Sequence, residues 1–326
     1  MNVLVVGGAG YIGSHICKNL AANGWKPVVY DNLSRGDRRF VLWGPLVEGD
    51  IRDRGKLQET ILKYRPVATI HLAAFAYVGE SNEDPRIYYN NNVVGSLTLI
   101  DALSANGNLP MVFSSSCTVY GNQSNLPLTE SHPVAPINPY GNSKLTVENI
   151  LADYRRAYGF PSTTLRYFNA VGADPDMETG ESHNPEPHLI PIILEVAYGD
   201  KPHLTVFGND YPTPDGSCVR DYIHVSDIAR AHVLVLEELL KDNAKPLYNL
   251  GTGVGYSVLE IVRAVEKVAK VQVPVEFAPR RAGDPATLYA DASLIQDHLG
   301  WKPEYMELEY IIDTAWRWFK KERIGS

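Results

Sequence analysis

A glycine-rich turn close to the N-terminus constrains the fold of this chain more than any other feature. The apolar residues 3–6 lead directly into Gly7, Gly10 and Gly13, and helix-forming residues follow. A buried strand, a glycine turn and a helix, in that order, begin a parallel α/β sheet, and the bare backbone of the turn lets a pyrophosphate reach the helix N-terminus. The spacing G-x-x-G-x-x-G is one residue longer between the first two glycines than the usual fingerprint. The turn predicts a bound dinucleotide.

The first half of the chain alternates β-rich runs with helical stretches. We expect strands at 3–6, 27–30, 47–48, 68–72, 111–114, 162–166 and 247–250, and helices over 11–23, from Pro139 onward and over 228–240. This alternation is typical of an α/β fold with a Rossmann-type doubly wound parallel sheet. The regular alternation of strands and helices ends near Asn169, which predicts a smaller C-terminal substrate-binding lobe. We therefore predict a dinucleotide-binding domain at 1–168, with returning segments near 226–252, and a second domain at 169–326.

Composition limits the possible partners and the compartment. The 326 residues carry a formal charge of −8, which disfavours binding to nucleic acid or to an anionic membrane. Cys17, Cys117 and Cys218 are far apart, and no group of His, Cys, Asp and Glu has metal-ligand spacing, so we expect free thiols and no metal. No apolar run approaches membrane-spanning length, and strand-like residues begin at position 2. We expect a cytoplasmic protein without a signal peptide.

An acidic residue at the end of the second strand indicates which dinucleotide binds. Asp31 lies at the distance from the turn where a carboxylate accepts hydrogen bonds from the adenosine ribose, which favours NAD over NADP. The ends of the third and fourth strands supply further candidates near the adenine and the cofactor backbone. The expected cofactor contacts are Gly7, Gly10, Tyr11, Ile12, Gly13, Asp31, Asn32, Asp50, Ile51, Leu72, Ala73 and Ala74.

Three residues carry the predicted chemistry. Tyr140 and Lys144 are four apart on a predicted helix, so their side chains share one face. A free tyrosine has a pKa of about 10, and a nearby ammonium together with an oxidised nicotinamide would lower that value. Tyr140 would then take a proton from a substrate alcohol while hydride leaves the carbon. Ser116, expected just beyond the fifth strand, would orient the same oxygen, and Lys144 would also hold the nicotinamide ribose.

With these motifs the chain resembles the extended short-chain dehydrogenase/reductase family, and within it the 4-epimerases of UDP-glucose and UDP-galactose. The resemblance covers essentially the whole chain. The most specific segment is 207–225, because a generic dinucleotide fold does not require it. The segments that carry the resemblance include GGAGYIGSH (7–15), YDNLS (30–34), INPYGNSK (137–144), FGNDYPTPDGSCVRDYIHV (207–225) and PRRAGDP (279–285).

The resemblance implies a redox cycle with no net oxidation. Tyr140 would deprotonate the sugar 4-hydroxyl, C4 would pass hydride to tightly held NAD, and the 4-keto sugar would turn over before hydride returns to its other face. The UDP-sugar partner would contact Ser116, Tyr140, Asn169, Leu189, Phe207, Arg220, Tyr222, Arg281 and Asp284, and NAD would also contact Asn91, Tyr140, Lys144 and Tyr167. The resemblance further implies a homodimer, with its interface expected around residues 92–104 and 143–158.

Four positions depart from the family's pattern. Many members have lysine where this chain has Ala76, so one cationic contact to NAD is missing. Val6 replaces a common threonine, with a mild expected effect. His188 stands where many members have asparagine, so the uracil contact would differ. Leu288 occupies the position expected to limit substrate size, and leucine lies between the residues that exclude and admit a 2-acetamido group.

Other functions remain open at this stage. A 4,6-dehydratase usually has Asp-Glu directly after the serine or threonine of this site, whereas Cys117 and Thr118 follow Ser116 here. A 4-epimerase of UDP-xylose and UDP-arabinose, or of UDP-N-acetylhexosamines, would show almost the same motifs. A regulator that binds NAD without turnover would be expected to lack Tyr140 or Lys144.

Overall fold

Seven parallel strands form the central sheet of a computed structural model that describes residues 1–281 and 284–324. Their order across the sheet is β10-β6-β5-β4-β1-β2-β3, and it reverses between β1 and β4, where doubly wound folds bind their ligands. The strands are β1 (Asn2–Val6), β2 (Lys26–Asp31), β3 (Leu46–Glu48), β4 (Ala68–His71), β5 (Met111–Ser116), β6 (Ser162–Tyr167) and β10 (Leu247–Leu250).

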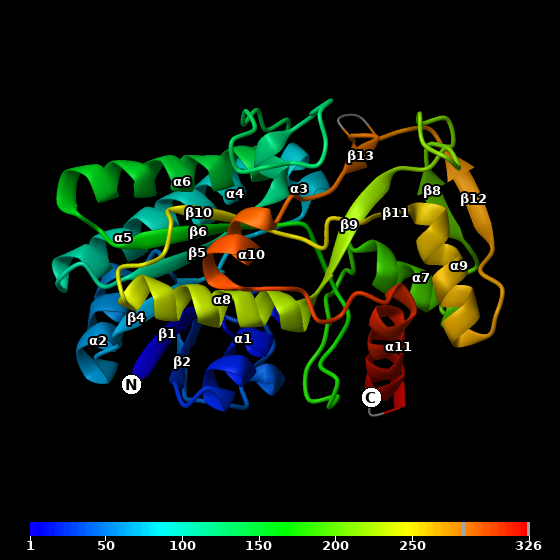
Figure 1. The fold of residues 1–326 in the computed structure, drawn as a ribbon. Helices are drawn as coiled ribbons and strands as arrows, with labels where there is room; N and C mark the ends of the chain where they lie inside the picture. The colour runs from blue at the N-terminus through cyan, green and yellow to red at the C-terminus, as the bar shows by residue number, and fades with distance from the viewer. Residues whose placement is uncertain (282–283, 325–326) are drawn as a thin grey trace.

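Helices cover both faces of this sheet because successive strand residues point to opposite sides. Val3 and Val5 of β1 pack on one face against α1 (Tyr11–Ala22) and α8 (Val225–Leu240). Leu4 and Val6 belong to the core on the other face, which is closed by α2 (Arg54–Tyr64), α5 (Gly95–Ala105) and α6 (Pro139–Tyr158). In Figure 1, α6 and α8 run along opposite sides of the strands. The predicted Rossmann-type fold is confirmed.

Short helical segments connect these elements near the ends of β2, β4 and β5. Two of them, α3 (Val78–Glu83) and α4 (Pro85–Tyr88), lead through a π-helical turn at Tyr89–Val94 into α5. Two 3₁₀ turns lie at Arg38–Phe40 and Cys117–Tyr120.

The C-terminal lobe has its own core between small sheets and three helices. One sheet contains β7 (Asn169–Val171), β9 (Val219–His224), β11 (Gly255–Ser257) and β13 (Thr287–Leu288), and a second pairs β8 (Leu204–Phe207) with β12 (Val275–Ala278). The helices α7 (Leu189–Tyr198), α9 (Val258–Ala269) and α11 (Leu308–Ile324) contribute buried apolar side chains to this core. The helix α10 (Ser293–Leu299) packs instead against β10 of the large sheet.

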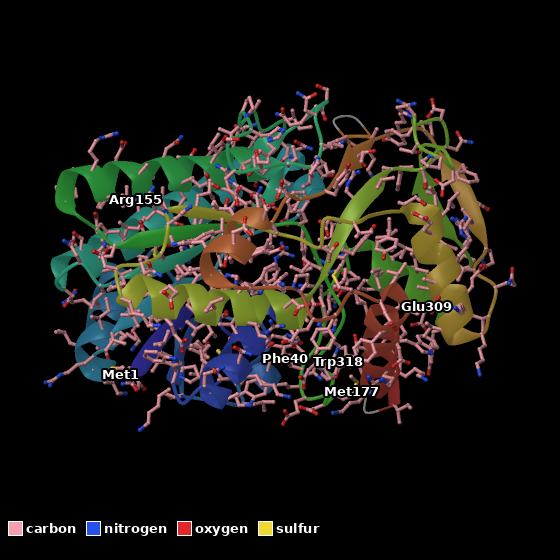
Figure 2. All side chains as sticks on the ribbon, in the orientation of Figure 1. Met1, Phe40, Arg155, Met177, Glu309 and Trp318 are labelled. Carbon is pink, nitrogen blue, oxygen red and sulfur yellow. The ribbon has the colours of Figure 1, made fainter. Side chains whose placement is uncertain are left out.

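The two lobes share a small apolar contact under α11. Phe40 and Trp318 lie 5.9 Å apart between ring centroids, and Met177 packs beside them. Figure 2 shows these three labelled side chains gathered between the C-terminal helix and the N-terminal lobe. An ion pair between Arg39 and Glu322 (3.1 Å) flanks the same contact. Side chains therefore join the lobes directly.

The expected strands and helices are confirmed with small shifts at their ends. Ser116 is the last residue of β5 and does not lie beyond it, and α8 begins at Val225 instead of residue 228. Residues 172–188 form a loop without helix or strand. Positions 282–283 of the segment 279–285 lie outside the described residues. Within the described chain, no helix combines the length and apolar character needed to cross a membrane.

Candidate active site

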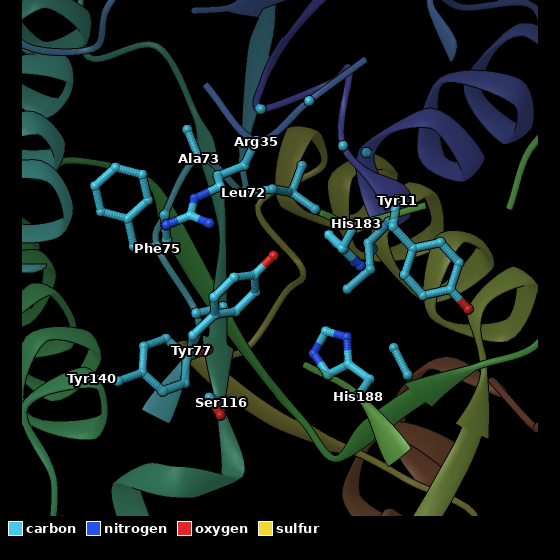
Figure 3. Close-up of a pocket in the computed structure, with 18 of the residues that line it drawn as sticks. Tyr11, Arg35, Leu72, Ala73, Phe75, Tyr77, Ser116, Tyr140, His183 and His188 are labelled. Carbon is cyan, nitrogen blue, oxygen red and sulfur yellow. The ribbon is translucent and has the colours of Figure 1, made fainter. Parts of the chain in front are cut away.

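A cavity of about 390 Å³ opens where the carboxyl ends of the central strands meet the C-terminal lobe. Its lining comes from the glycine turn, the ends of β2, β4, β5 and β6, the first turns of α6, and the segment that leads from β7 to α7. Figure 3 shows Tyr140, Ser116 and Tyr77 on one side and His183 and His188 on the other. The two lobes thus build the cavity together.

The glycine turn forms a bare cradle at one end of the cavity. Gly7 has φ +88°, and a Cβ there would lie 2.6 Å from the Ala73 nitrogen; at Gly13 a Cβ would lie 2.2 Å from the Gly7 carbonyl. Gly10 is the N-cap of α1 and offers no side-chain cap, and the first turn of the helix carries no acidic residue. The helix N-terminus therefore faces the cavity as an anion site, which fits a dinucleotide pyrophosphate.

The carboxylate of Asp31 lies beside this turn. It accepts hydrogen bonds from the backbone N–H groups of Ala9 (3.0 Å) and Leu33 (2.9 Å). Burial raises the pKa of Asp31, and these two hydrogen bonds oppose the shift. The two arginines that follow are already paired, Arg35 with Glu80 (2.5 Å) and Arg38 with Glu48. The Asp31 carboxylate can accept hydrogen bonds from a ribose, and the neighbouring arginines are already paired with carboxylates. This arrangement fits NAD better than NADP.

Ser116, Tyr140 and Lys144 meet at the other end of the cavity. The helix α6 begins at Pro139 because Asn138 caps it by accepting a hydrogen bond from the Gly141 N–H (2.8 Å). One turn later the Lys144 ammonium donates to the Ser114 carbonyl (2.8 Å) and lies 5.9 Å from the centroid of the Tyr140 ring. The spacing predicted from the sequence therefore does bring the three side chains to one place.

Burial sets the protonation of this group. Burial raises the pKa of Tyr140, and a hydrogen bond with Ser116 opposes the shift. Burial also lowers the pKa of Lys144 to about 7, although the Glu148 charge favours the ammonium. His71 behind the site has a pKa lowered to about 3 by burial and then by the Lys144 charge. Burial thus favours the neutral form of each group. A cation bound nearby would therefore strongly lower the pKa of Tyr140.

The residues after Ser116 provide no acid for an elimination. Thr118 donates to the Ser116 Oγ through its backbone N–H (3.2 Å) and its hydroxyl (3.0 Å). Cys117 lines the cavity, but burial raises the pKa of its thiol to about 12. These contacts orient the serine hydroxyl and do not supply the carboxyl group that a 4,6-dehydratase requires.

Most of the predicted cofactor contacts line the same cavity. The lining includes Gly7, Gly10, Tyr11, Ile12, Gly13, Asp31, Asn32, Ile51, Leu72, Ala73, Ala74, Asn91, Tyr140, Lys144 and Tyr167. Asp50 is absent from it, because its carboxylate binds Arg52 (2.6 Å) and accepts from Asn32 (3.2 Å). The proposed contact between Asp50 and adenine remains a prediction.

The residues expected to bind the UDP-sugar fall into two groups. Asn169, Leu189 and Tyr222 line the cavity with Ser116 and Tyr140. A second group lies apart from that lining on the C-terminal lobe: Arg220 pairs with Asp284 (2.9 Å), and the Arg281 guanidinium lies 3.9 Å from the centroid of the Phe207 ring. Their role in binding remains a prediction.

Two features of the cavity were not foreseen from the sequence. The Arg35 guanidinium lies over the rings of Phe75 (5.4 Å) and Tyr77 (4.7 Å), so the ion pair of Arg35 with Glu80 lies on the wall near Ala76. Opposite it, Glu181, His183 and His188 line the wall formed by residues 181–188. The only sequence signal for this wall was its density of acidic and histidine residues.

Comparisons with known proteins cover both lobes. The sequence profile of the "NAD dependent epimerase/dehydratase family" matches residues 3–251. A protein of Rhizobium leguminosarum bv. trifolii named UDP-glucose 4-epimerase is 52% identical over 319 residues, 98% of this chain and 97% of that protein. The crystal structure of UDP-glucose 4-epimerase from Brucella ovis in complex with NAD has a TM-score of 0.95 at 54% identity, covering 98% of each chain.

A second solved structure is similar over its whole length. UDP-glucose 4-epimerase from Stenotrophomonas maltophila, with bound NAD and formylated UDP-arabinopyranose, has a TM-score of 0.96 at 42% identity, covering 100% of both chains. The likeness therefore includes residues 252–326 of the C-terminal lobe, which lie beyond the match to the family profile.

Proposed function

Because this chain belongs to the NAD-dependent epimerase/dehydratase family, we propose that it interconverts UDP-glucose and UDP-galactose by inverting C4 of the hexose with bound NAD. One observation carries the proposal: Ser116, Tyr140 and Lys144 meet in the cavity that also contains the glycine turn and Asp31. The relatives named UDP-glucose 4-epimerase match essentially the whole chain, which supports the same activity.

The N-terminal lobe, residues 1–168 with the returning segment 226–252, would hold the cofactor. The N-terminus of α1 would bind the pyrophosphate, Asp31 the adenosine ribose, and Lys144 the nicotinamide ribose. When bound, NAD would supply a reversible hydride acceptor for C4 of the sugar, so that the reaction would have no net redox change.

The protein's own residues then move and hold a proton. Tyr140 in its phenolate form takes the proton of the sugar 4-hydroxyl at its Oη and later returns it to the same oxygen. Burial alone disfavours that phenolate, so the positive charges of Lys144 and of the oxidised cofactor are needed to stabilise it. Ser116 donates its hydroxyl hydrogen to the sugar oxygen and keeps it beside the tyrosine.

The C-terminal lobe, residues 169–326, would bind the UDP part and leave the hexose free to turn. Arg220 and Arg281 match the geometry of a diphosphate, and Phe207 offers an aromatic face. Leu189, Asn169 and Tyr222 line the cavity, where they would contact the bound UDP-sugar. A firmly bound nucleotide with a loosely held 4-keto sugar presents both faces of C4 in turn.

Two alternative substrates merit a direct comparison. A 4-epimerase of UDP-xylose and UDP-arabinose is favoured by the Stenotrophomonas relative, whose structure contains a UDP-arabinopyranose derivative. For UDP-N-acetylhexosamines, the critical position is Leu288, which is 6% exposed and packs in one cluster with Cys117 and Phe168, two residues of the cavity wall. Leu288 would therefore act on substrate size from behind that wall.

We further propose that the protein is a cytoplasmic homodimer. The three cysteines are free, as suits a reducing compartment. The segment expected at the dimer interface includes Val94, which is 52% exposed just before α5. Light scattering after size exclusion would detect the dimer, and a monomer at micromolar concentration would contradict it.

The experiment for the activity is proton NMR of the purified protein with UDP-galactose and no added NAD. Formation of UDP-glucose would establish the epimerase and its retained cofactor, and UDP-N-acetylgalactosamine and UDP-xylose would define its breadth. A second run with added NAD separates lost cofactor from absent activity. If no sugar were converted in either run, the result would contradict the proposal and favour a non-catalytic NAD-binding regulator.

A further inference from the structure

The loop wall, defined here as residues 181–188, gathers four metal-ligating side chains in one place. Glu181, His183, Glu186 and His188 each present one ligand atom, and these atoms all lie within 4.8 Å of one another. Figure 3 shows His183 and His188 on the side of the cavity that faces Tyr77 and Ser116. This grouping was not expected, because the sequence spacing matched no helix or strand.

The distances within the cluster resemble those of a tetrahedral site. His183 Nδ1 lies 3.3 Å from Glu181 Oε1 and 3.6 Å from Glu186 Oε2. His188 Nδ1 lies 3.4 Å from Glu186 Oε1 and 2.6 Å from Glu181 Oε1. Zinc bonds of about 2.0–2.1 Å place tetrahedral ligands about 3.3 Å apart. The contact between His183 and Glu181 lies near that value, and so do the two contacts with Glu186, which end on different oxygens of its carboxylate.

The orientation of the side chains is a separate observation. Glu181 Oε1 and His183 Nδ1 are buried and form no hydrogen bond of good geometry, and their close polar neighbours are other members of the cluster: Glu181 Oε1 lies 2.6 Å from His188 Nδ1 and 3.3 Å from His183 Nδ1. The Glu181 side chain is only 9% exposed, so water does not satisfy it. Buried polar atoms without a hydrogen-bond partner need an explanation. Both atoms are therefore free to bind a shared ion.

The charges of the cluster also call for a cation. With neutral imidazoles the two carboxylates leave a charge of about −2 at a largely buried place, which a divalent ion would balance. Imidazole nitrogen with carboxylate oxygen selects zinc and similar transition metals over calcium or magnesium. The second acidic group, Asp174 with Asp176 and Glu178, differs because the Lys18 ammonium already lies within 2.8 Å of all three.

We propose that Glu181, His183, Glu186 and His188 bind one zinc ion that holds the loop wall in place. Four protein ligands leave no open position, so the ion would be structural and would not touch the sugar. His188 is the N-cap residue of α7, and Leu189 behind it lines the cavity. The ion therefore anchors the start of α7 against the rest of the wall.

The competing state is a cluster held by protons. Burial alone would lower the pKa of His183 and His188, but the two carboxylates outweigh burial and raise these values to about 9 and about 10. Without metal, both imidazoles would then be charged at neutral pH. Zinc binding would displace both protons, so its affinity should rise with pH.

The test uses the whole protein, stripped with chelator, reloaded with zinc and dialysed, with metal measured by mass spectrometry. We expect one zinc per chain in the wild type and none in the double variant Glu181→Gln/His183→Gln. The matched control His203→Gln/Glu276→Gln removes an exposed His–Glu pair elsewhere (3.3 Å) and should keep its zinc. Equal zinc in both variants would place the metal at another site and overturn the proposal.

A second measurement does not depend on the folding of any variant. Cobalt substituted for zinc in the wild type should give the visible absorption of a tetrahedral cobalt site, and added zinc should remove it. A wild type that retains no zinc and shows no such absorption would establish the proton-held cluster instead.

Discussion

Two walls of one cavity position charged groups in opposite ways. The catalytic wall, defined here by the proposed catalytic residues Ser116, Tyr140 and Lys144, is built on β5 and α6, and burial drives its tyrosine and lysine toward their neutral forms. The loop wall at 181–188 has no helix or strand, and there opposite charges outweigh burial, so that its histidines are protonated more readily.

The difference follows from what holds each wall in place. Backbone hydrogen bonds of β5 and α6 fix the catalytic wall, so its side chains need no mutual attraction and remain poised for proton transfer. The loop wall has no such scaffold, and its side chains must bind one another or a shared ion.

The largest effect is expected from a variant that disrupts the catalytic wall. Tyr140→Phe removes the hydroxyl that takes the substrate proton, so turnover of UDP-galactose should fall by about 10²–10⁴-fold, measured by proton NMR. Tyr158→Phe changes an exposed tyrosine at the end of the same helix and should leave the rate unchanged. Undiminished turnover in Tyr140→Phe would remove the tyrosine from the mechanism.

Lys144→Met should weaken activity and also reveal the cost of the buried charge. The folded pKa of Lys144, about 7, lies below the ordinary value of about 10.5, so the unfolded chain binds more protons between these pH values. Wild-type stability should therefore rise with pH across that window through this group. Urea unfolding should show the variant most stabilised near pH 6, with the gain shrinking toward pH 10.

Lys56→Met is the matched control, since Lys56 lies on the exposed face of α2. It should change neither activity nor the pH dependence of unfolding. If Lys144→Met gave the same flat profile as this control, the buried lysine would not carry the depressed pKa.

The loop wall should show the opposite pH dependence once metal is removed. In chelated protein, the folded pKa values of His183 and His188 lie above the ordinary value of about 6.5. Their stabilising contribution is complete below that value and is lost as pH rises through about 9 and 10. In the presence of chelator, the melting temperature should fall by several degrees over this pH range. The melting temperature of the zinc-loaded protein should fall less.

The smallest expected effect concerns how firmly NAD is held. Ala76→Lys adds a cation to the cavity wall beside Arg35, so NAD retention after dialysis should rise a few-fold, measured by absorbance of the released cofactor. Leu62→Lys adds the same charge at an exposed position of α2 and should have no effect. An equal rise in both variants would point to net charge alone.

The two walls also differ in how well they could be predicted. The meeting of Ser116, Tyr140 and Lys144 was predicted, because an i,i+4 pair on a helix and a serine at a strand end have positions set by local geometry, and their catalytic roles stay a proposal. Asp31 and the glycine turn were predicted for the same reason. Arg220, Phe207, Arg281 and Asp284 could be named only through the family resemblance, since no local pattern marks them.

The loop wall shows why the remainder could not be predicted. The order Glu181, His183, Glu186, His188 has no regular period, so only the path of the loop decides whether these side chains meet. Leu288 illustrates the same limit, because its place behind the cavity wall depends on the pairing of β13 with β9.

The sequence by itself determined the doubly wound sheet, the dinucleotide end of the cavity and the three residues of the catalytic wall. These depend on hydrophobic periodicity, glycine sterics and helix spacing, which act over a few residues. Only the tertiary structure decided which cations are neutralised near Asp31 and which four side chains gather on the loop wall. Those contacts join residues without a common period, so they depend on the paths that the connecting loops take in the folded chain.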